Sequence, residues 1–502
     1  MSNSYRQILR SSSIIGGASV VNILVGLLRT KVAAMLLGPA GVGVIGLLQT
    51  LMATGSSVAA LGFGTVGTRQ IAEAVGEDDA AAVAAARRAL FWGTLGLATL
   101  GAAGFWFLRD ILAVRVLGDA AQGATVGWLA IGVGLSVATG SQWALLNGLR
   151  RIGDIAWGSV LSAVLSTVLG VMALWVWGER GVMAFVLSGP VAGFLLGHWY
   201  VSRLPRIRGA RTPLTQLAAQ WKTLARLGMA FMVAGLAATL GQLAVRVLIQ
   251  RELGMESLGH FQAAWAISMT YVGFVLTAMG TDYYPRLTAV IRDHAAVNRL
   301  VNEQTEVALL LAGPVFIAML GLAPWVIQLL YSSEFAEAAS VLKWQVLGDV
   351  LKVASWPLGF VIVAAGAGRT FMLTESLAVA VFVVLTWLCI PWLGIKASGI
   401  AFVGMYAVLL PVVFLLARRR TGFAWQQRVV RQGVLLMVLA AAVFVASEWS
   451  QWLGAATGVL LAAALVMLAL ARLGHMANLG GPLGRVAAAS QHWMQKAGVW
   501  RD

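Results

Sequence analysis

Charge is scarce in this chain. Only 11% of its 502 residues are charged, whereas 59% are hydrophobic. A soluble protein of this length needs far more charge to cover its surface. Apolar runs of about twenty residues recur along the whole sequence, and each is long enough to cross a hydrocarbon core of roughly 30 Å. The composition therefore predicts an all-α, polytopic membrane protein.

Residue types and motifs that carry covalent chemistry are also scarce. The single cysteine, Cys389, excludes a disulfide framework and a cysteine-based metal site. The sequence has no Walker-type phosphate loop, no His-Glu-x-x-His motif and no Gly-x-Ser-x-Gly elbow. The loops are too short to hold a catalytic domain. We therefore expect a protein that moves a substrate across the bilayer, with no cofactor, no metal and no enzymatic activity.

Fourteen apolar runs are expected to span the membrane. They cover residues 12–37, 42–70, 87–108, 124–148, 155–177, 182–202, 227–250, 259–284, 304–322, 338–364, 371–393, 398–417, 432–447 and 453–472. Arg6 and Arg10 before the first run resemble the start of a signal peptide, but no small-residue cleavage site follows. We therefore interpret the first run as a span.

The net charge of +16 has a topological pattern. With a cytoplasmic N-terminus, 25 of the 36 basic residues fall on inner segments, including the tail. Only five fall on outer loops, namely Arg109, Arg115, Arg180, Arg251 and Lys396. This split follows the positive-inside rule and predicts that both termini are cytoplasmic. It also argues against nucleic acid as a partner. The basic inner segments are instead expected to contact anionic lipid head groups.

The two halves of the sequence resemble each other. The turn at 37–43 has a counterpart at 253–259, and both place a glycine five residues after another glycine. Arg29 and Arg246 precede these turns at a similar offset, and two further matches keep the offset at 216 to 218 residues: Arg151 with Arg369, and 183–185 with 400–402. The repeat predicts two pseudo-symmetric six-helix lobes around a central cavity.

The expected organisation has four parts. They are an N-terminal six-helix lobe at 1–202, a basic cytoplasmic linker at 203–226, a C-terminal six-helix lobe at 227–417, and a helix pair with a cytoplasmic tail at 418–502. The linker carries six basic residues and no acidic ones. The last two spans would be an appendage to the repeat.

Several glycine-rich motifs resemble a known family. They are Gly38-Pro39-Ala40-Gly41-Val42-Gly43, then Gln49, Gly62-Phe63-Gly64 and Asn147-Gly148-Leu149-Arg150-Arg151-Ile152. These resemble Wzx-type O-antigen flippases of the multidrug/oligosaccharidyl-lipid/polysaccharide exporter superfamily, which has two six-helix lobes around a cavity. Fourteen spans are closer to the lipid II flippases of that superfamily.

The resemblance implies a substrate and a location. The substrate would be an undecaprenyl-pyrophosphate-linked oligosaccharide, flipped from the cytoplasmic to the periplasmic leaflet of the bacterial inner membrane. A polysaccharide polymerase and a chain-length regulator would be possible partners. A drug or cation antiporter of the same superfamily, or a polymerase or ligase, are the alternatives. The antiporter predicts deep acidic residues, and the polymerase predicts a large outer loop.

Such a substrate gives a reason for charges inside the spans. Fixed cations in a wet cavity would offset the cost of moving a pyrophosphate through a region of low dielectric. The candidate substrate-binding residues are Arg29, Arg246, Lys352, Lys31, Asn147 and Gln49. Snorkelling of the arginines, a structural pairing of Lys352 with Asp349, and helix–helix hydrogen bonds for the neutral residues are the alternatives.

Two aspartates are candidates for ion coupling or for structural ion pairs. Asp349 lies three residues before Lys352, and Asp282 lies near the inner end of its span. Tyr283 and Tyr284, which follow Asp282, are expected in an interfacial aromatic belt. Farther toward the N-terminus, Arg69 and Glu73 are spaced for a salt bridge along one helix face.

Overall fold

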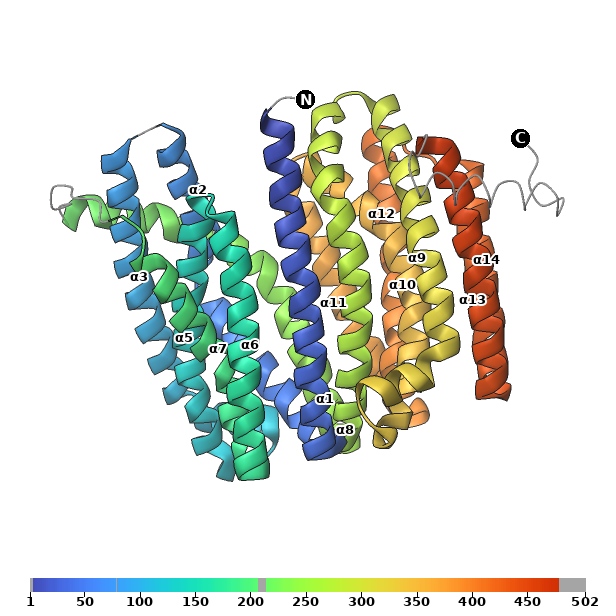
Figure 1. Ribbon diagram of the computed structural model, residues 1–502, viewed down its shortest axis with the longest axis horizontal. Coiled ribbons are helices and arrows are strands. Elements are labelled where there is room, and N and C mark those ends of the chain that lie inside the picture. Colours follow the sequence, from blue (N-terminus) through green and yellow to red (C-terminus); the bar gives the residue numbers. More distant parts are fainter. Residues whose placement is uncertain (1–2, 78, 206–213, 478–502) are drawn as a thin grey trace. The chain divides into compact units, whose positions relative to one another are not determined.

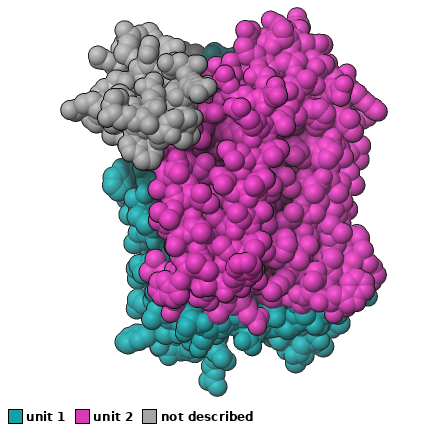
Figure 2. Space-filling view, turned by 90° about the vertical axis from the view of Figure 1, so that its right-hand side faces the viewer, with its two compact units in different colours: residues 1–262, 330–334 teal, residues 263–329, 335–502 magenta. Residues whose placement is uncertain are grey.

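The computed structural model describes residues 3–77, 79–205 and 214–477, which form two compact units (Figures 1 and 2). Every regular element in these ranges is a helix, which confirms the predicted all-α fold class. Residues 206–213 of the expected linker and the tail from 478 onward lie outside the described residues.

The first unit comprises residues 1–262 and 330–334. Its helices are α1 (Asn3–Ala59), α2 (Phe63–Gly76), α3 (Ala80–Phe107), α4 (Arg109–Leu112), α5 (Gly123–Gly148), α6 (Ile152–Trp177), α7 (Val182–Ser202) and the first part of α8 (Leu214–Val290). A π-helical turn at Ala113–Leu117 and 3-10 turns at Ala120–Gln122 and Gly178–Gly181 link them.

The second unit comprises residues 263–329 and 335–502. Its helices are the remainder of α8, then α9 (His294–Leu330), α10 (Ala336–Ala364), α11 (Gly368–Leu393), α12 (Lys396–Thr421), α13 (Gln427–Trp449) and α14 (Gln451–Ala477). A 3-10 turn at Ser333–Phe335 precedes α10. The two units divide within α8, after the expected basic linker, so the four-part organisation stays a prediction.

The count of fourteen spans stays a prediction. Ten of the described helices are long and apolar enough to cross a membrane, and a bent pair within α8 makes eleven. Three of these segments, Ile14–Ala59, Ile152–Ser202 and Gly235–Thr277, are 46, 51 and about 43 residues long. A straight helix of 46 residues would be about 69 Å long, more than twice the thickness of a hydrocarbon core. Each of the three covers most or all of two predicted spans.

Glycines turn the chain between the paired spans of α1 and α8. Gly38 has φ 63° and Gly254 has φ 88°, inside what would otherwise be continuous helices. This left-handed region disfavours side chains, and glycine enters it without steric penalty. The two glycines are counterparts in the repeat, so the same turn device occurs at the end of the first span and of the seventh.

The two turns pack against each other reciprocally. A Cβ on Gly43 would collide with the carbonyl oxygen of Met255, and one on Gly259 would collide with that of Pro39. Met255 follows Pro39 by 216 residues, and Gly259 follows Gly43 by the same number. The contact is therefore the same on both sides under the repeat offset, as an approximate two-fold relation between the two turns requires. This supports the internal repeat inferred from the sequence.

The last two helices are fastened to the second unit by buried polar contacts. Glu306 on α9, which is 4% exposed, lies 3.5 Å from Arg472 on α14 and 4.0 Å from Arg428 on α13. Farther along α13, Glu448 pairs with the buried Lys343 of α10. Ion pairs at both ends of α13 fix its position along the lobe.

The loop before α13 is held by two asparagines on α9. Asn298 donates to the Thr421 carbonyl and accepts from the Ala424 amide. Asn302 donates to the Ala424 carbonyl and accepts from the Gln426 amide. These bonds satisfy backbone groups that have no helical partner at the break between α12 and α13.

The reciprocal glycine contact should be sensitive to a single methyl group. We expect Gly43→Ala and Gly259→Ala each to lower the free energy of unfolding by about 1–3 kcal/mol, because the carbonyl facing each glycine belongs to backbone and cannot rotate away. Thermal unfolding of the purified protein in detergent measures the effect. Gly26→Ala is the matched control, because no atom lies within 4 Å of its added Cβ. Equal stability of all three variants would contradict the close contact.

Candidate functional site

Arg29 is held by neighbouring helices of the first unit. Its guanidinium donates to Ser166 Oγ on α6 at 2.9 Å, and to the Phe185 carbonyl and Ser188 Oγ on α7 at 2.7 and 3.0 Å. It also lies 4.3 Å from the centre of the Phe185 ring. Three hydrogen bonds and an aromatic face replace much of the water that a buried guanidinium loses. These contacts fit a side chain that joins α1 to α6 and α7.

Arg246, the counterpart of Arg29, has a different environment. It is 3% exposed, and its Nε donates to Gln262 Oε1 at 3.0 Å. A second bond of 3.1 Å runs from its Nη1 to the Gln242 carbonyl, one turn earlier on α8. Arg246 is therefore positioned by a neutral amide and a backbone carbonyl.

A polar pocket lies beside Arg246 in the first unit. Its volume is about 160 Å³. The lining residues are Gly46, Gln49, Thr50 and Ala53 of α1, and Thr239, Gln242 and Gln262 of α8. Three glutamine amides in an apolar helical unit provide both donors and acceptors, which suits hydroxyl-rich ligands. The structure thus brings Gln49 close to the Gln262 that binds Arg246.

Gly46 makes room for this pocket. A Cβ at position 46 would lie 2.6 Å from Gln262 Cδ and 2.8 Å from its Oε1. Gln262 follows Gly46 by 216 residues, so the two are counterparts in the repeat. The pocket therefore lies between α1 and α8, the two helices whose glycine turns contact each other.

In the second unit, a carboxylate is fully enclosed. Asp349 on α10 has 0% exposure, and its Oδ2 accepts from Ser268 Oγ at 2.7 Å and from the Tyr271 hydroxyl at 2.6 Å. Lys352 follows one turn later, with its Nζ 3.4 Å from Met269 Sδ. The expected pairing of Lys352 with Asp349 is electrostatic here, and the two do not close a direct hydrogen bond.

Other candidate residues are placed apart from these groups. Asn147 is exposed at the end of α5, and Lys31 is half-buried on α1. Asp282 is exposed and pairs with Arg286 at 3.0 Å. Tyr283 differs from the expected belt: it is 1% exposed and donates to the Pro357 carbonyl at 3.0 Å. Its hydroxyl has found a partner inside the unit, so it does not need the interface.

The expected Arg69–Glu73 salt bridge is present at 2.7 Å. Several tryptophans at helix ends are strongly exposed on the protein surface, among them Trp175, Trp177, Trp392 and Trp449. Exposure of large rings with a polar N–H suits the membrane–water boundary.

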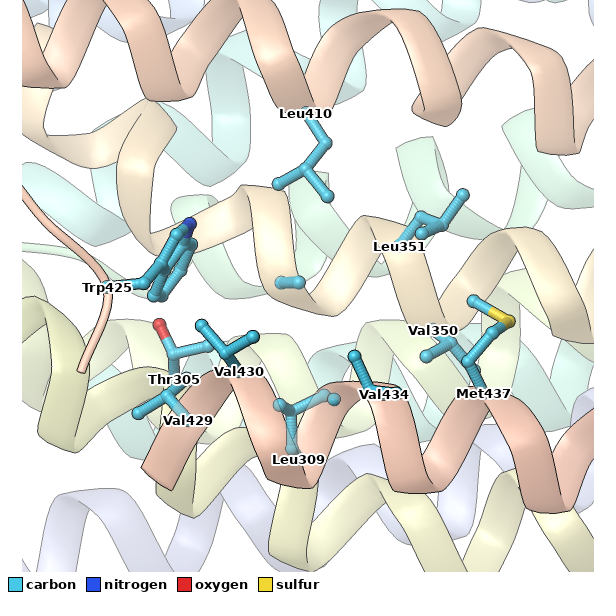
Figure 3. Close-up of a pocket in the computed structure, with 12 residues that line it drawn as sticks. Thr305, Leu309, Val350, Leu351, Leu410, Trp425, Val429, Val430, Val434 and Met437 are labelled. Atoms are coloured by element: carbon cyan, nitrogen blue, oxygen red, sulfur yellow. The ribbon is translucent and has the colours of Figure 1, made fainter. Parts of the chain in front are cut away.

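A second pocket lies among α9, α10, α12 and α13 (Figure 3). Its volume is about 320 Å³, and its lining is almost entirely aliphatic, with Trp425 and Thr305 at one end. Leu410, Leu351, Val434 and Met437 point into it. Such a lining suits a hydrocarbon chain and gives no hydrogen-bond partners to sugars or phosphates.

Sequence reasoning missed several of these groups. Ser268 and Tyr271, which bind Asp349, lie on α8 and look like ordinary span residues. Glu306 also escaped notice, although a glutamate inside an apolar run is a signal that could have found it. No group of three or more metal-ligating side chains is present among the described residues.

The sequence matches the family described as "Polysaccharide biosynthesis protein" over residues 32–340. The lipid III flippases of Escherichia coli (strain K12) and Shigella flexneri are each 25% identical to it over 423 residues, which cover 80% of this chain and 97% of those proteins.

Solved structures share the fold. The lipid II flippase MurJ in an inward closed conformation has a TM-score of 0.68 at 11% identity and covers 92% of this chain and 98% of its own. An inward-facing multidrug resistance MATE family transporter of the MOP superfamily has a TM-score of 0.64 at 18% identity, covering 80% and 98%. The similarity to these structures is in the fold.

The contacts of Arg29 predict a structural effect on substitution. We expect Arg29→Ala to destabilise the protein by about 1.5–3 kcal/mol, because it removes charged hydrogen bonds that join α1 to α6 and α7. Thermal unfolding in detergent is the measurement, with Arg69→Ala as the control. Arg69 is in an exposed ion pair, so its loss should change stability by less than about 1 kcal/mol. An Arg29→Ala variant as stable as the control would show that these bonds do not join the helices.

Proposed function

The chain belongs to the polysaccharide biosynthesis protein family, and on that premise we propose that it is a flippase for lipid-linked oligosaccharides. It is a multi-pass membrane protein of the superfamily expected from its glycine-rich motifs. The 25% identity to lipid III flippases along most of both chains supports this activity.

We propose undecaprenyl-pyrophosphate-linked repeat units as the substrate, moved from the cytoplasmic to the periplasmic leaflet of a bacterial inner membrane. The product would serve the synthesis of O-antigen or another surface polysaccharide. A polymerase and a chain-length regulator would then be partners downstream of the flipping step. Both termini are proposed to be cytoplasmic, as the distribution of basic residues indicates.

The observation that carries the proposal is the polar pocket next to a buried arginine. Sugar hydroxyls need hydrogen-bond partners when they leave water, and the amides of Gln49, Gln242 and Gln262 provide them. A phosphate group needs a positive charge, which Arg246 supplies beside the same pocket. The chemistry of the pocket therefore matches the polar end of a lipid-linked sugar.

We propose a different role for each of the other candidate substrate-binding residues. Lys352 is a second cation for the phosphate, half-buried in the second unit. Arg29 positions α1, which carries Gln49 at its second span. Lys31 and Asn147 are proposed to contact the substrate at the periphery, outside the polar pocket.

The alternatives predict different sites. An enzyme that polymerises or ligates glycans needs an activated base or nucleophile facing the substrate. The polar pocket is lined by amides and hydroxyls, and Arg246 is hydrogen-bonded to one of its glutamines. A transporter for organic cations needs an accessible carboxylate, and this pocket has none among its described lining residues. The transport experiment distinguishes the flippase from the enzyme and from the organic-cation transporter.

The test is flipping of an undecaprenyl-pyrophosphate oligosaccharide in proteoliposomes. We expect the wild type to flip it and Arg246→Ala to lose about 10- to 100-fold in rate, the equivalent of one charged hydrogen bond of about 1.5–3 kcal/mol. Arg246→Lys should keep part of the activity, because the charge is retained. A wild-type protein that flips no such lipid would overturn the proposal and direct the assay to organic cations.

A matched pair of glutamines separates the pocket from general stability. Gln242→Leu changes a lining residue of the pocket, whereas Gln250→Leu changes a half-buried glutamine two turns later on α8, which donates to the Leu117 carbonyl. We expect only the first to slow flipping while both proteins fold. Equal slowing by both would remove the pocket from the substrate path.

A further inference from the structure

Asp349 has one satisfied and one unsatisfied oxygen. Its Oδ2 accepts two hydroxyl hydrogen bonds, from Ser268 and Tyr271. Its Oδ1 is buried and has no hydrogen-bond partner in the described part of the chain. A fully enclosed carboxylate that keeps an oxygen unpaired carries a large desolvation penalty when ionised. Asp349 Oδ1 therefore lacks a hydrogen-bond partner among the described residues.

One turn before Asp349 there is a second unsatisfied group. Gln345 has 0% exposure, and neither its Nε2 nor its Oε1 has a partner among the described residues. Residues four apart on a helix share one face. A glutamine amide can either donate through its nitrogen or accept through its oxygen. It can therefore hydrogen-bond Asp349 Oδ1 as a carboxylate, and after a flip it can accept from Oδ1–H of the acid.

The charges around Asp349 are unequal in number. Lys352 interacts electrostatically with Asp349 and also with Glu375 on α11. The cluster of Asp349, Lys352 and Glu375, which we call the α10–α11 triad, thus has two acids and one base. If all three ionise, the triad has a net charge of −1, which is unfavourable around the fully buried Asp349, whereas Lys352 and Glu375 are half-buried. One added proton makes it neutral.

Other elements packed against the triad supply no second cation. On α8, Tyr271 donates to Asp349, and on α12, Tyr406 interacts with both carboxyl groups. On α9, Phe316 stacks edge-on against Tyr271, and the acidic Glu306 is engaged with Arg428 and Arg472. Earlier on α10, Lys343 is paired with Glu448. Among the described residues, the charge balance of the triad is therefore set by its own three members.

We propose that the α10–α11 triad is a binding site for a single proton, which is held on Asp349 with the Gln345 amide as the hydrogen-bond partner of the protonated acid. With the proton bound, Lys352 is balanced by one carboxylate, Glu375. When an anionic substrate approaches Lys352, it replaces the charge of that carboxylate and changes the affinity for the proton. The proton and the substrate are thereby linked, and this step rests on the proposed flippase function.

The proton site can be tested without substrate. Infrared difference spectra of the purified protein, recorded between neutral and alkaline pH, report loss of a carboxylic acid C=O band. We expect this band in the wild type and its loss in Asp349→Asn and in Glu375→Gln, because either variant leaves one acid and one base. Lys352→Met should keep the band to higher pH, since two acids then lack a cation.

Asp282→Asn is the control, because Asp282 is exposed and paired with Arg286. Its spectrum should match the wild type. A wild type without the acid band, or an Asp349→Asn variant that keeps it in the presence of Glu375 and Lys352, would overturn the assignment. Spectra that respond to Na⁺ at constant pH and show no acid band would identify the triad as a cation site, which also overturns it.

Coupling is tested separately in proteoliposomes. One proton exchanged per cycle changes the steady-state distribution of the lipid about tenfold for each pH unit across the membrane. Asp349→Asn and Glu375→Gln should still flip downhill but lose this dependence, whereas Asp282→Asn keeps it. An acid band without flipping by the wild type would contradict the flippase proposal and leave the proton site standing. Flipping with an acid band but with no pH dependence would overturn the coupling.

Discussion

The cost of burying charge and unpaired polar groups among apolar helices shapes the buried polar contacts of this protein. In a hydrocarbon-like interior, the attraction between opposite charges is strong, but the loss of hydration is larger unless hydrogen bonds replace it. The structure meets this constraint in three ways. Arg29 receives three oxygen acceptors, Glu306 and Lys343 form ion pairs, and the asparagines of α9 satisfy an open backbone. Each solution joins two or more helices, so the cost of burial also determines how the units are held together.

The internal repeat explains why two equivalent positions have different roles. Arg29 and Arg246 occupy matching places before the glycine turns, and the turns contact each other through residues that are equivalent in the repeat. The surroundings have diverged. Arg29 is saturated by serines and a carbonyl, whereas Arg246 lies beside a pocket lined by glutamines. A duplicated cation can thus serve packing in one copy and remain beside a polar pocket in the other.

Much of this could be predicted from the sequence, and the limit has a physical cause. Hydrophobic runs and short matched motifs are local properties. The apolar spans followed from the runs, and the repeat with its glycine turns followed from the motifs. The Arg69–Glu73 pair was predictable because its members are four residues apart on one helix. The partners of Arg29 are 137 to 159 positions away, and those of Asp349 are 78 and 81 positions away. Such contacts depend on helix packing, which periodicity alone does not determine. Tyr283 was wrongly assigned to the interface for the same reason: its partner, Pro357, lies on another helix.

The contrast between the two charged sites also bears on how transport can be driven. Arg246, which donates to the Gln262 amide and the Gln242 carbonyl, keeps its charge over the physiological pH range. Lys352 shares its charge with two carboxylates, so its attraction for an anion depends on how many of them are ionised. Linkage requires that an anion binding at such a lysine changes proton affinity by the same factor that the proton changes anion affinity. A fixed site alone can bind a substrate but cannot exchange energy with an ion gradient. A site with more acids than bases can do so, because an ionised carboxylate and an anionic ligand compete for the same lysine.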